Sequence, residues 1–245
     1  MSLTILITNI VLADRSGTEV VVEQLADGLR RREHRPVVFS PHHGGLAEQM
    51  RARGHVVIDR RDACPWRVDV IHAHHIGPAM AALAAHPGVP ALFGCHDATA
   101  PFDTLPPHPR VRRVFAVDER CRARMVSDGA EPATVVLLPN AVDLARVPLR
   151  TRSLPARPLR AVTLTKHGGH LPILREACTT AGISLDEVGS GPARMTERPE
   201  LALANADLVF ATARSALEAA AAGAGVVVCD ARGGWCRWCC RMGPK

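Results

Sequence analysis

The sequence contains no tyrosine, and aromatic residues make up only 3% of its 245 residues. An aliphatic core is therefore expected, and its many Ala residues suit the close helix–sheet packing of layered α/β proteins. The scarcity of aromatic rings also removes the stacking platforms on which proteins bind single-stranded nucleic acids. Although the formal net charge is +6, the sequence has no recognised nucleic-acid motif, so nucleic acid is not expected as a partner.

No apolar run is long enough to span a membrane, and the opening stretch MSLTILITNIVL lacks the basic region and cleavage site of a signal peptide. Four of the eight Cys fall inside expected strands and helices, and before the tail the Cys lack the spacing of a disulfide framework. These absences predict a protein of the reducing cytoplasm. The scattered Arg residues favour solvated helix faces first, and contact with an anionic ligand or with lipid at the inner membrane face second.

Short apolar runs alternate with amphipathic stretches along the chain. Strands are predicted at residues 3–8, 35–40, 55–58, 68–74, 89–95, 113–117 and 133–138, and helices at 17–33, 45–54, 77–85 and 119–128. The alternation resumes at residue 160, with strands at 160–165, 184–189, 207–212 and 225–230. Continuous apolar strands separated by helices are typical of parallel sheets covered on both faces. The fold class predicted is α/β, with two Rossmann-like, doubly wound parallel-sheet domains.

The expected domains are residues 1–145, a proline-rich linker at 146–159, and a partial second domain at 160–233. Residues 234–245, GWCRWCCRMGPK, differ in composition from everything before them. Cys236 and Cys239 have the spacing of half a zinc site, but no second ligand pair is suitably spaced. Shifting the reading frame by one base would convert the Trp and Cys codons into those of an ordinary apolar run. We therefore expect a frameshifted tail and a second domain that is cut short.

The order of the motifs resembles that of GT-B glycosyltransferases of the family 4 type. The resemblance is carried by SGTEVVVEQLADGLRRREHRPVVFS, DVIHAHH, PALFGCHDA, VVLLPNAVDLARV and ADLVFATARSALEAAAAGAGVVVCDARG. It covers nearly the whole chain up to about Gly233, and each piece is weak when taken alone. Glu33 and Ala141 occupy places where the family usually has Gly. Sugar-nucleotide epimerases with the same fold share some of these motifs.

The resemblance implies a donor site in the second domain. Glu218 would bind the ribose of a nucleotide-sugar, because a carboxylate accepts two hydroxyl donors at once. Its alternative is a capping box with Ser215. Lys166, Gly168 and Gly169 would hold the donor diphosphate, since small residues let backbone amides approach phosphate; a solvated loop is the alternative for Lys166. The family's second acid is replaced by Phe210, and its usual Arg by Ala161, with Arg160 displaced by one residue.

In the first domain the resemblance gives His96 an active-site role in contact with the transferred sugar. Gly17 would approach the donor, and Ser16, His74, Asp97 and Asn140 are cleft-lining candidates. A tight turn explains Ser16 and Gly17 equally well, and a turn also explains Asn140. His72, His74 and His75 cluster after a strand, but without a carboxylate or fourth ligand nearby they do not favour a metal site.

The predicted function is transfer of a hexose from a nucleotide-sugar donor to a glycan, lipid-linked or small-molecule acceptor. No cofactor is expected beyond the nucleotide-sugar as co-substrate. Two alternatives stay open. The first is a sugar-nucleotide epimerase. The second is a non-catalytic remnant or binding module, which the missing Arg, the missing acid and the unusual tail favour.

Overall fold

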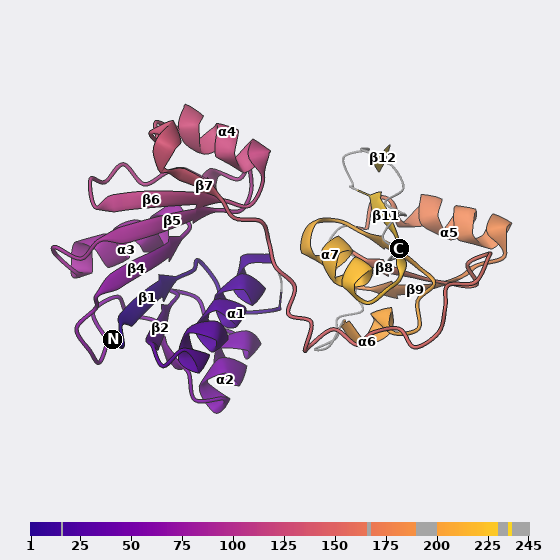
Figure 1. The fold of residues 1–245 in the computed structure, drawn as a ribbon, viewed down its shortest axis with the longest axis horizontal. Helices are drawn as coiled ribbons and strands as arrows, with labels where there is room; N and C mark the ends of the chain where they lie inside the picture. Colours follow the sequence, from indigo (N-terminus) through magenta and orange to yellow (C-terminus); the bar gives the residue numbers. More distant parts are fainter. Residues whose placement is uncertain (16, 166–167, 190–199, 230–234, 237–245) are drawn as a thin grey trace. The chain divides into compact units, whose positions relative to one another are not determined.

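The computed structural model describes residues 1–15, 17–165, 168–189, 200–229 and 235–236 (Figure 1). The chain forms two compact units, Met1–Asn140 and Ala141–Lys245, which we call unit 1 and unit 2. The expected domain boundary at residue 145 lies just beyond this division. None of the helices in the described part of the chain combines the length and the apolar character needed to cross a membrane.

Unit 1 is a seven-stranded parallel sheet in the order β3-β2-β1-β4-β5-β6-β7. Its strands are β1 (Thr4–Thr8), β2 (Arg35–Phe39), β3 (Val56–Ile58), β4 (Val70–His74), β5 (Ala91–Cys95), β6 (Val111–Ala116) and β7 (Val135–Leu137). Its helices are α1 (Gly17–Arg31), α2 (Gly45–Ala52), α3 (Ile76–Ala85) and α4 (Glu119–Ser127), with short 3-10 turns η1 (Pro101–Asp103) and η2 (Pro132–Thr134). This strand order is that of the doubly wound dinucleotide-binding fold.

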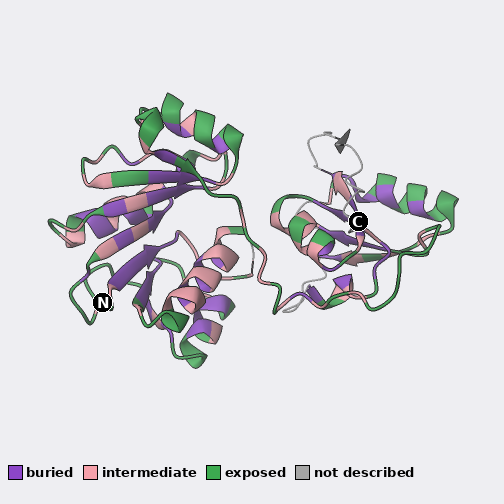
Figure 2. Cartoon of the chain, viewed as in Figure 1, coloured by how far each residue is buried: buried purple, intermediate pink, exposed green. Residues whose placement is uncertain are grey.

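Alternating side chains of unit 1 enter two separate apolar clusters, one on each face of the sheet. Ile5 and Ile7 of β1 pack with residues of α1 and α2. Leu6 packs on the other face, in a cluster that contains side chains of α3 and α4. Successive side chains of a strand point to opposite faces, so a strand covered by helices on both sides must be apolar throughout. Figure 2 shows these strands as largely buried.

Unit 2 is a five-stranded sheet in the order β12-β11-β10-β8-β9, in which β12 alone runs antiparallel to its neighbour. Its strands are β8 (Arg160–Leu164), β9 (Ser184–Val188), β10 (Leu208–Ala211), β11 (Gly225–Cys229) and β12 (Trp235–Cys236). Its helices are α5 (Leu171–Ala181), α6 (Glu200–Leu203) and α7 (Ala213–Ala221). The prediction of two α/β parallel-sheet domains is confirmed.

The segment predicted to be a linker is packed against unit 2. Val147 is buried in the same apolar cluster as Val162, Val209 and Ala219. The Arg150 guanidinium pairs with Asp207 at 2.5 Å, and the Arg150 amide donates to the carbonyl of Ala222. Residues 146–159 have no helix or strand, but these anchors make them part of unit 2 rather than a free connection. Of the atypical tail, only the short strand β12 lies within the described residues, so its frameshift origin stays a prediction.

Candidate functional site

Each unit has a topological switch point at the carboxyl edge of its sheet, where neighbouring strands send their connections to opposite sides. In unit 1 the switch lies between β1 and β4, and in unit 2 between β8 and β10. Ligands of doubly wound sheets bind at such points, outside the carboxyl ends of the strands. Many of the residues singled out from the sequence lie at the ends of these four strands or in the segments that follow them, including Gly17, His74, His75, Gly168 and Glu218.

Three histidines gather at the carboxyl ends of β4 and β5. His72 and His74 lie on one face of β4 with their ring centroids 4.9 Å apart, as their alternation in the sequence predicts. The register pairs His74 with Gly94 of β5, so His96, two residues further on, returns to the same face. His74 Nδ1 lies 2.7 Å from His96 Nε2, and one hydrogen atom is shared between the two rings.

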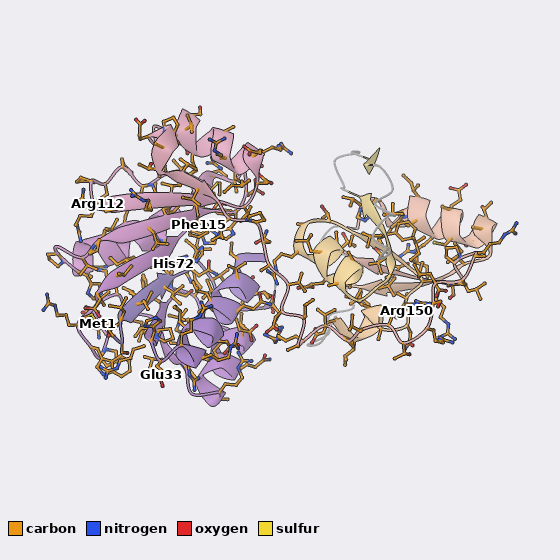
Figure 3. The ribbon with its side chains drawn as sticks, in the orientation of Figure 1. Met1, Glu33, His72, Arg112, Phe115 and Arg150 are labelled. Carbon is orange, nitrogen blue, oxygen red and sulfur yellow. The ribbon has the colours of Figure 1, made fainter. Side chains whose placement is uncertain are left out.

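Phe115 of β6 closes this cluster from the side, and Figure 3 labels it together with His72. Its ring makes edge contacts with all three histidines, with centroid distances of 5.2 Å to His72, 5.9 Å to His74 and 5.9 Å to His96. A Cβ atom on Gly94 would overlap the Phe115 ring. Glycine is therefore required at position 94 for the phenyl ring to lie across β5 and reach the imidazoles.

His75 joins three segments around the β1–β4 switch. Its φ of 63° places a non-glycine residue in the left-handed region, a strained backbone that is common near functional sites. Its Nδ1 accepts a hydrogen bond from the amide of Ile10 in the loop after β1. Its Nε2 lies 3.5 Å from Thr18 Oγ1 on α1 and 3.8 Å from a carboxylate oxygen of Asp103. These contacts fix the entrance to α3 relative to α1.

Asp103 supports the backbone that carries His96. One of its carboxylate oxygens accepts hydrogen bonds from the amides of His96 and Asp97, at 3.1 and 2.6 Å. The side chain of Asp97 is occupied nearby, accepting from the amides of Thr99 and Ala100 and from the Thr99 hydroxyl. Asp97, a cleft-lining candidate, therefore shapes the loop after β5. Nothing in the sequence around Asp103 signals its role, because it comes from a short turn in a proline-rich segment.

Burial keeps the histidines of this region neutral. It lowers the pKa of His72 to about 4 and that of His75 to about 4. The pKa of His74 falls well below its ordinary value, because the side chain is fully buried and has other imidazoles as neighbours. Burial raises the pKa of Asp103 to about 6, against the opposing effect of its backbone hydrogen bonds. Loss of water disfavours the charged form of any group.

The other candidates in unit 1 lie in the loops at its carboxyl edge or at its end. Gly17 begins α1, is exposed and has φ of 45°, which a glycine adopts without strain. Ser16 lies outside the described residues. Asn140 is the last residue of unit 1, in the irregular stretch after β7. Among the described residues, no group of three or more His, Cys, Asp and Glu side chains is arranged to hold a metal ion.

In unit 2, Glu218 lies on α7 and forms an ion pair with Arg214, one helical turn earlier, at 3.1 Å. Both side chains are largely covered, with 20% of Glu218 and 11% of Arg214 exposed.

The alternative interpretation of Glu218, a capping box with Ser215, is wrong. Helix α7 begins at Ala213, its N-cap is Thr212, and no side chain caps it, so Ser215 lies inside the helix. The four-residue spacing of Arg214 and Glu218 could have revealed this pair from the sequence.

The loop between β8 and α5 contains the predicted phosphate-binding residues. Lys166 lies outside the described residues. The carbonyl of Gly168 accepts from the amide of Leu171. Gly169 is exposed, and a Cβ atom added to it would meet nothing within 4 Å. His170, which the sequence analysis gave no role, occupies the N-cap position of α5. Its ring is buried, and neither ring nitrogen has a hydrogen-bond partner in the described structure.

The sequence departs from the family pattern at two positions, Phe210 in place of the second acid and Ala161 in place of the arginine. Phe210 is buried in β10 and packs with side chains of α5, so the place of the family's second acid belongs to the core. Arg160 is the first residue of β8. It starts at the amino edge of the sheet, about 13 Å along the strand from the loop at its carboxyl edge. Arg160 is exposed and Ala161, at the family's position, is buried, so the two side chains lie on opposite faces of β8.

Part of unit 1 matches a known protein family in sequence. Residues 58–146, which include the histidine cluster and Asp103, match the family model described as Glycosyltransferase Family 4. This segment of the chain is similar to Glycosyltransferase Family 4. The resemblance inferred from the motifs is thereby confirmed, and with it the prediction of an enzyme of the glycosyltransferase class. No curated protein matches the chain by sequence.

Solved structures show the same fold at low sequence identity. A glycosyltransferase from Rickettsia africae is 13% identical, with a TM-score of 0.69, 92% of this chain covered and 78% of that chain. Anabaena HepE in complex with UDP-glucose is 14% identical, with a TM-score of 0.69 and coverage of 92% and 80%. A UDP-N-acetylglucosamine 2-epimerase is 11% identical, with a TM-score of 0.56 and coverage of 93% and 79%. The GT-B fold of this chain is thus shared with a glycosyltransferase, with HepE and with a UDP-N-acetylglucosamine 2-epimerase.

Proposed function

We propose that this chain transfers a hexose from a nucleotide-sugar to a glycan, lipid-linked or small-molecule acceptor. Unit 2 binds the donor through Glu218, Gly168, Gly169 and Lys166. Unit 1 binds the acceptor and provides His96 as the catalytic residue that contacts the transferred sugar, with Gly17 approaching the donor. No further cofactor takes part in this proposal.

The observation that carries the proposal is the position of Glu218. Glu218 belongs to α7, the helix that follows β10, and β10 is one of the two strands at the switch point of unit 2; its carboxylate pairs with Arg214 at 3.1 Å. A fixed carboxylate accepts two hydroxyl donors, which suits the vicinal hydroxyls of a ribose. The neighbouring loop between β8 and α5 presents Gly168 and Gly169, where backbone amides suit phosphate.

The chemistry proposed needs little beyond positioning and charge stabilisation. Departure of a nucleoside diphosphate develops negative charge on the leaving oxygen, and an ammonium group with helix amides near that oxygen stabilises it. Lys166 and the loop before α5 serve this role in the proposal. HepE, whose structure contains UDP-glucose, supports a nucleotide-sugar donor for a chain with this fold.

We also propose a cytoplasmic location, because a nucleotide-sugar donor and reduced thiols are both consistent with the cytoplasm. Among the described residues, Cys64, Cys95, Cys121 and Cys178 are free thiols. Free buried thiols are usual for proteins of a reducing environment. Peripheral contact with the inner membrane face is proposed only for the case of a lipid-linked acceptor.

Titration calorimetry with UDP-, GDP- and ADP-sugars tests the donor. We expect saturable binding of one of them, and absence of binding by all three would support a non-catalytic remnant instead. Product analysis then separates transferase from epimerase. A transferase releases free nucleotide and a new glycoside, whereas an epimerase returns an isomerised nucleotide-sugar.

The Glu218→Ala substitution tests the residue on which the proposal depends. Loss of charge-assisted hydrogen bonds to a ribose is expected to weaken donor binding about 10- to 100-fold. Glu176 on α5 is exposed, so Glu176→Ala is the matched control and should bind as the wild type does. Thermal unfolding without ligand completes the test: a loss of much more than ~1 kcal/mol in Glu218→Ala would assign Glu218 a structural role with Arg214.

A further inference from the structure

The loop that carries His96 is held by the carboxylate of Asp103. Asp103 lies in η1 and is fully buried, and its Oδ2 atom accepts hydrogen bonds from two backbone amides. These are the amides of His96 and Asp97, the first two residues after β5, at 3.1 and 2.6 Å. Hydrogen bonds to an ionised acceptor are roughly twice as strong as bonds between neutral groups. The backbone position of His96 therefore depends on the ionisation of Asp103.

The second carboxylate oxygen of Asp103 is unsatisfied. Oδ1 is buried, and none of the described residues gives it a hydrogen bond. A buried carboxylate that uses only one of its oxygens loses solvation at the other without compensation. Unsatisfied buried atoms are uncommon, and a catalytic role is one of their explanations. Asp103 is thus poorly placed to stabilise the fold and well placed to respond to protons.

The neighbouring ring of His75 suits the ionised form of Asp103. The amide of Ile10 donates to His75 Nδ1, so the proton of the neutral ring lies on Nε2. This Nε2 is the atom that lies 3.8 Å from Asp103 Oδ1. A carboxylate oxygen is attracted by an N–H at that distance. A protonated Oδ1 would instead place its hydroxyl group beside an N–H that cannot accept a hydrogen bond.

We infer that Asp103 is a positioning residue, whose ionised carboxylate fixes the backbone of His96 and Asp97 and thereby the place of the His96 ring. A neutral Asp103 still accepts from both amides, but more weakly, so the loop after β5 is held less firmly. The inference rests on the proposed function for the part that His96 takes in turnover. The dependence of the loop on Asp103 does not rest on it.

Two charged groups near Asp103 come from α4 and from the loop after β5. Arg124 of α4 donates to the carbonyls of Asp97 and Ala100, at 3.0 and 2.6 Å, and lies 3.5 Å from Asp128. The Asp97 carboxylate accepts from the amide of Ala100. Arg124 and Asp97 act on the pKa of Asp103 in opposite directions. Burial has the largest effect and raises this pKa to about 6.

The other titratable neighbours of Asp103 come from α3, from β5 and from α4. Burial lowers the pKa of His75 to about 4 and raises that of Cys95 to about 11. Burial also raises the pKa of Cys121 on α4. These three groups therefore keep their charge state between pH 5 and 8. His96 carries an imidazole of its own, so the experiment distinguishes its titration from that of Asp103.

NMR of the full chain without substrate tests the inference. We expect the carbon-13 signal of the Asp103 carboxyl and the amide proton of Asp97 to titrate together, with a midpoint near pH 6. His96→Gln removes the imidazole and should keep this midpoint. Asp103→Asn keeps an oxygen acceptor but cannot ionise, so the Asp97 amide should no longer titrate. Asp62→Asn is the control, since Asp62 is exposed and pairs with Arg60; it should titrate as the wild type does.

Two NMR results would overturn the inference. One is an Asp97 amide that titrates alike in the wild type and in Asp103→Asn. The other is loss of the midpoint in His96→Gln, which would assign the titration to the imidazole. If Asp103→Asn does not fold, the comparison of the wild type with His96→Gln still decides.

Turnover gives a second readout. Release of nucleoside diphosphate from UDP-, GDP- and ADP-glucose is measured with water as acceptor, and circular dichroism verifies folding at each pH. For one group with a pKa of about 6, kcat should fall roughly tenfold from pH 7 to pH 5. Asp103→Asn imitates the neutral acid, so its kcat at pH 7 should be roughly 10- to 100-fold lower. Its profile should be flat, with KM changed much less. A wild-type acid limb that persists in Asp103→Asn would contradict the positioning role.

The two proposals fail separately. An Asp97 amide that follows the ionisation of Asp103, in a chain that releases nucleotide from none of the three donors, would reject the proposed function and keep the inference. Turnover in a chain whose Asp97 amide is independent of Asp103 would reject the inference alone.

Discussion

The ring of Phe115 occupies the space that a side chain at Gly94 would need. The two residues lie on neighbouring strands, paired in register across β5 and β6. Through this close approach the phenyl ring meets His72, His74 and His96 edge-on. The absence of one side chain on β5 thus permits the packing of the three imidazoles.

Gly94→Ala should therefore disturb the histidine cluster. An added methyl group in a close-packed site forces neighbouring groups to move, and such overpacking costs about 1–3 kcal/mol. We expect the variant to unfold at lower urea concentration and to show changed ring NMR signals for His74 and His96.

Gly77→Ala is the control for this substitution. Gly77 lies in α3, and nothing lies within 4 Å of an added Cβ. Alanine is the better helix former, so Gly77→Ala should leave the stability unchanged or raise it by up to about 1 kcal/mol. Equal stability of Gly94→Ala and the wild type would contradict the packing role given to Phe115.

Most of the fold could be predicted from the sequence, because each strand of a doubly wound sheet is an apolar run between helical stretches. The strand predicted at residues 89–95 is β5 (Ala91–Cys95), and the helix predicted at 119–128 is α4 (Glu119–Ser127). Helix ends were less well predicted. The capping box was placed at Ser215 because Ser and Glu have the right spacing, but α7 starts two residues earlier, at Ala213 with φ of 50°.

The candidate site could be predicted only in part, because its contacts depend on strand register. His74 and His96 are 22 residues apart, and they meet because β4 and β5 pair His74 with Gly94. Period-two alternation then brings His96 to the same face. A register is not visible in one sequence, so the pair was missed although both residues were named. The anchoring of residues 146–159 was missed for a related reason: Arg150 meets Asp207, which is distant in the chain.

The ion pair of Arg150 and Asp207 predicts that the segment before β8 is needed for the stability of unit 2. Both side chains are more than nine-tenths covered. Asp207 also accepts from the amides of Leu159 and Arg160. Arg150→Ala leaves a buried carboxylate without its cation, and the loss of one partner of a buried pair costs about 3 kcal/mol. Urea unfolding of the full chain measures this.

The control is Arg152→Ala, since Arg152 is exposed and only its backbone carbonyl accepts from Arg150. A loss below about 1 kcal/mol in Arg150→Ala would place the pair among weak surface contacts.

Acid should remove the stabilisation that the Arg150–Asp207 ion pair provides. Burial raises the pKa of Asp207, but the hydrogen bonds from Leu159, Arg150 and Arg160 outweigh it and lower the pKa below 3.8. The contribution is thus present above pH 3.8 and lost as the pH falls through the lower folded value.

The buried histidines of unit 1 predict that the fold loses stability between pH 6.5 and 4. His72 and His75 have pKa values lowered from 6.5 to about 4 by burial. In this window the unfolded chain binds a proton at each position and the folded chain does not, so stability rises with pH. Asp103 acts in the opposite direction: its pKa is raised to about 6, so its contribution is present below pH 3.8 and lost as the pH rises through about 6. His74, whose folded pKa lies well below 6.5, adds a third proton, so three histidines against one carboxyl leave a net slope of roughly 2.7 kcal/mol per pH unit.

Urea unfolding of the full chain at a series of pH values, followed by circular dichroism, measures this slope. His72→Phe keeps an aromatic ring beside Phe115 but removes one titrating group, so the slope between pH 6 and 4 should fall by roughly 1 kcal/mol per pH unit. His42→Gln removes a histidine that is exposed on the surface and should leave the slope as it is in the wild type. An unchanged slope in His72→Phe would mean that His72 takes up a proton as readily in the folded chain as in the unfolded one, in spite of its packing between His74 and Phe115.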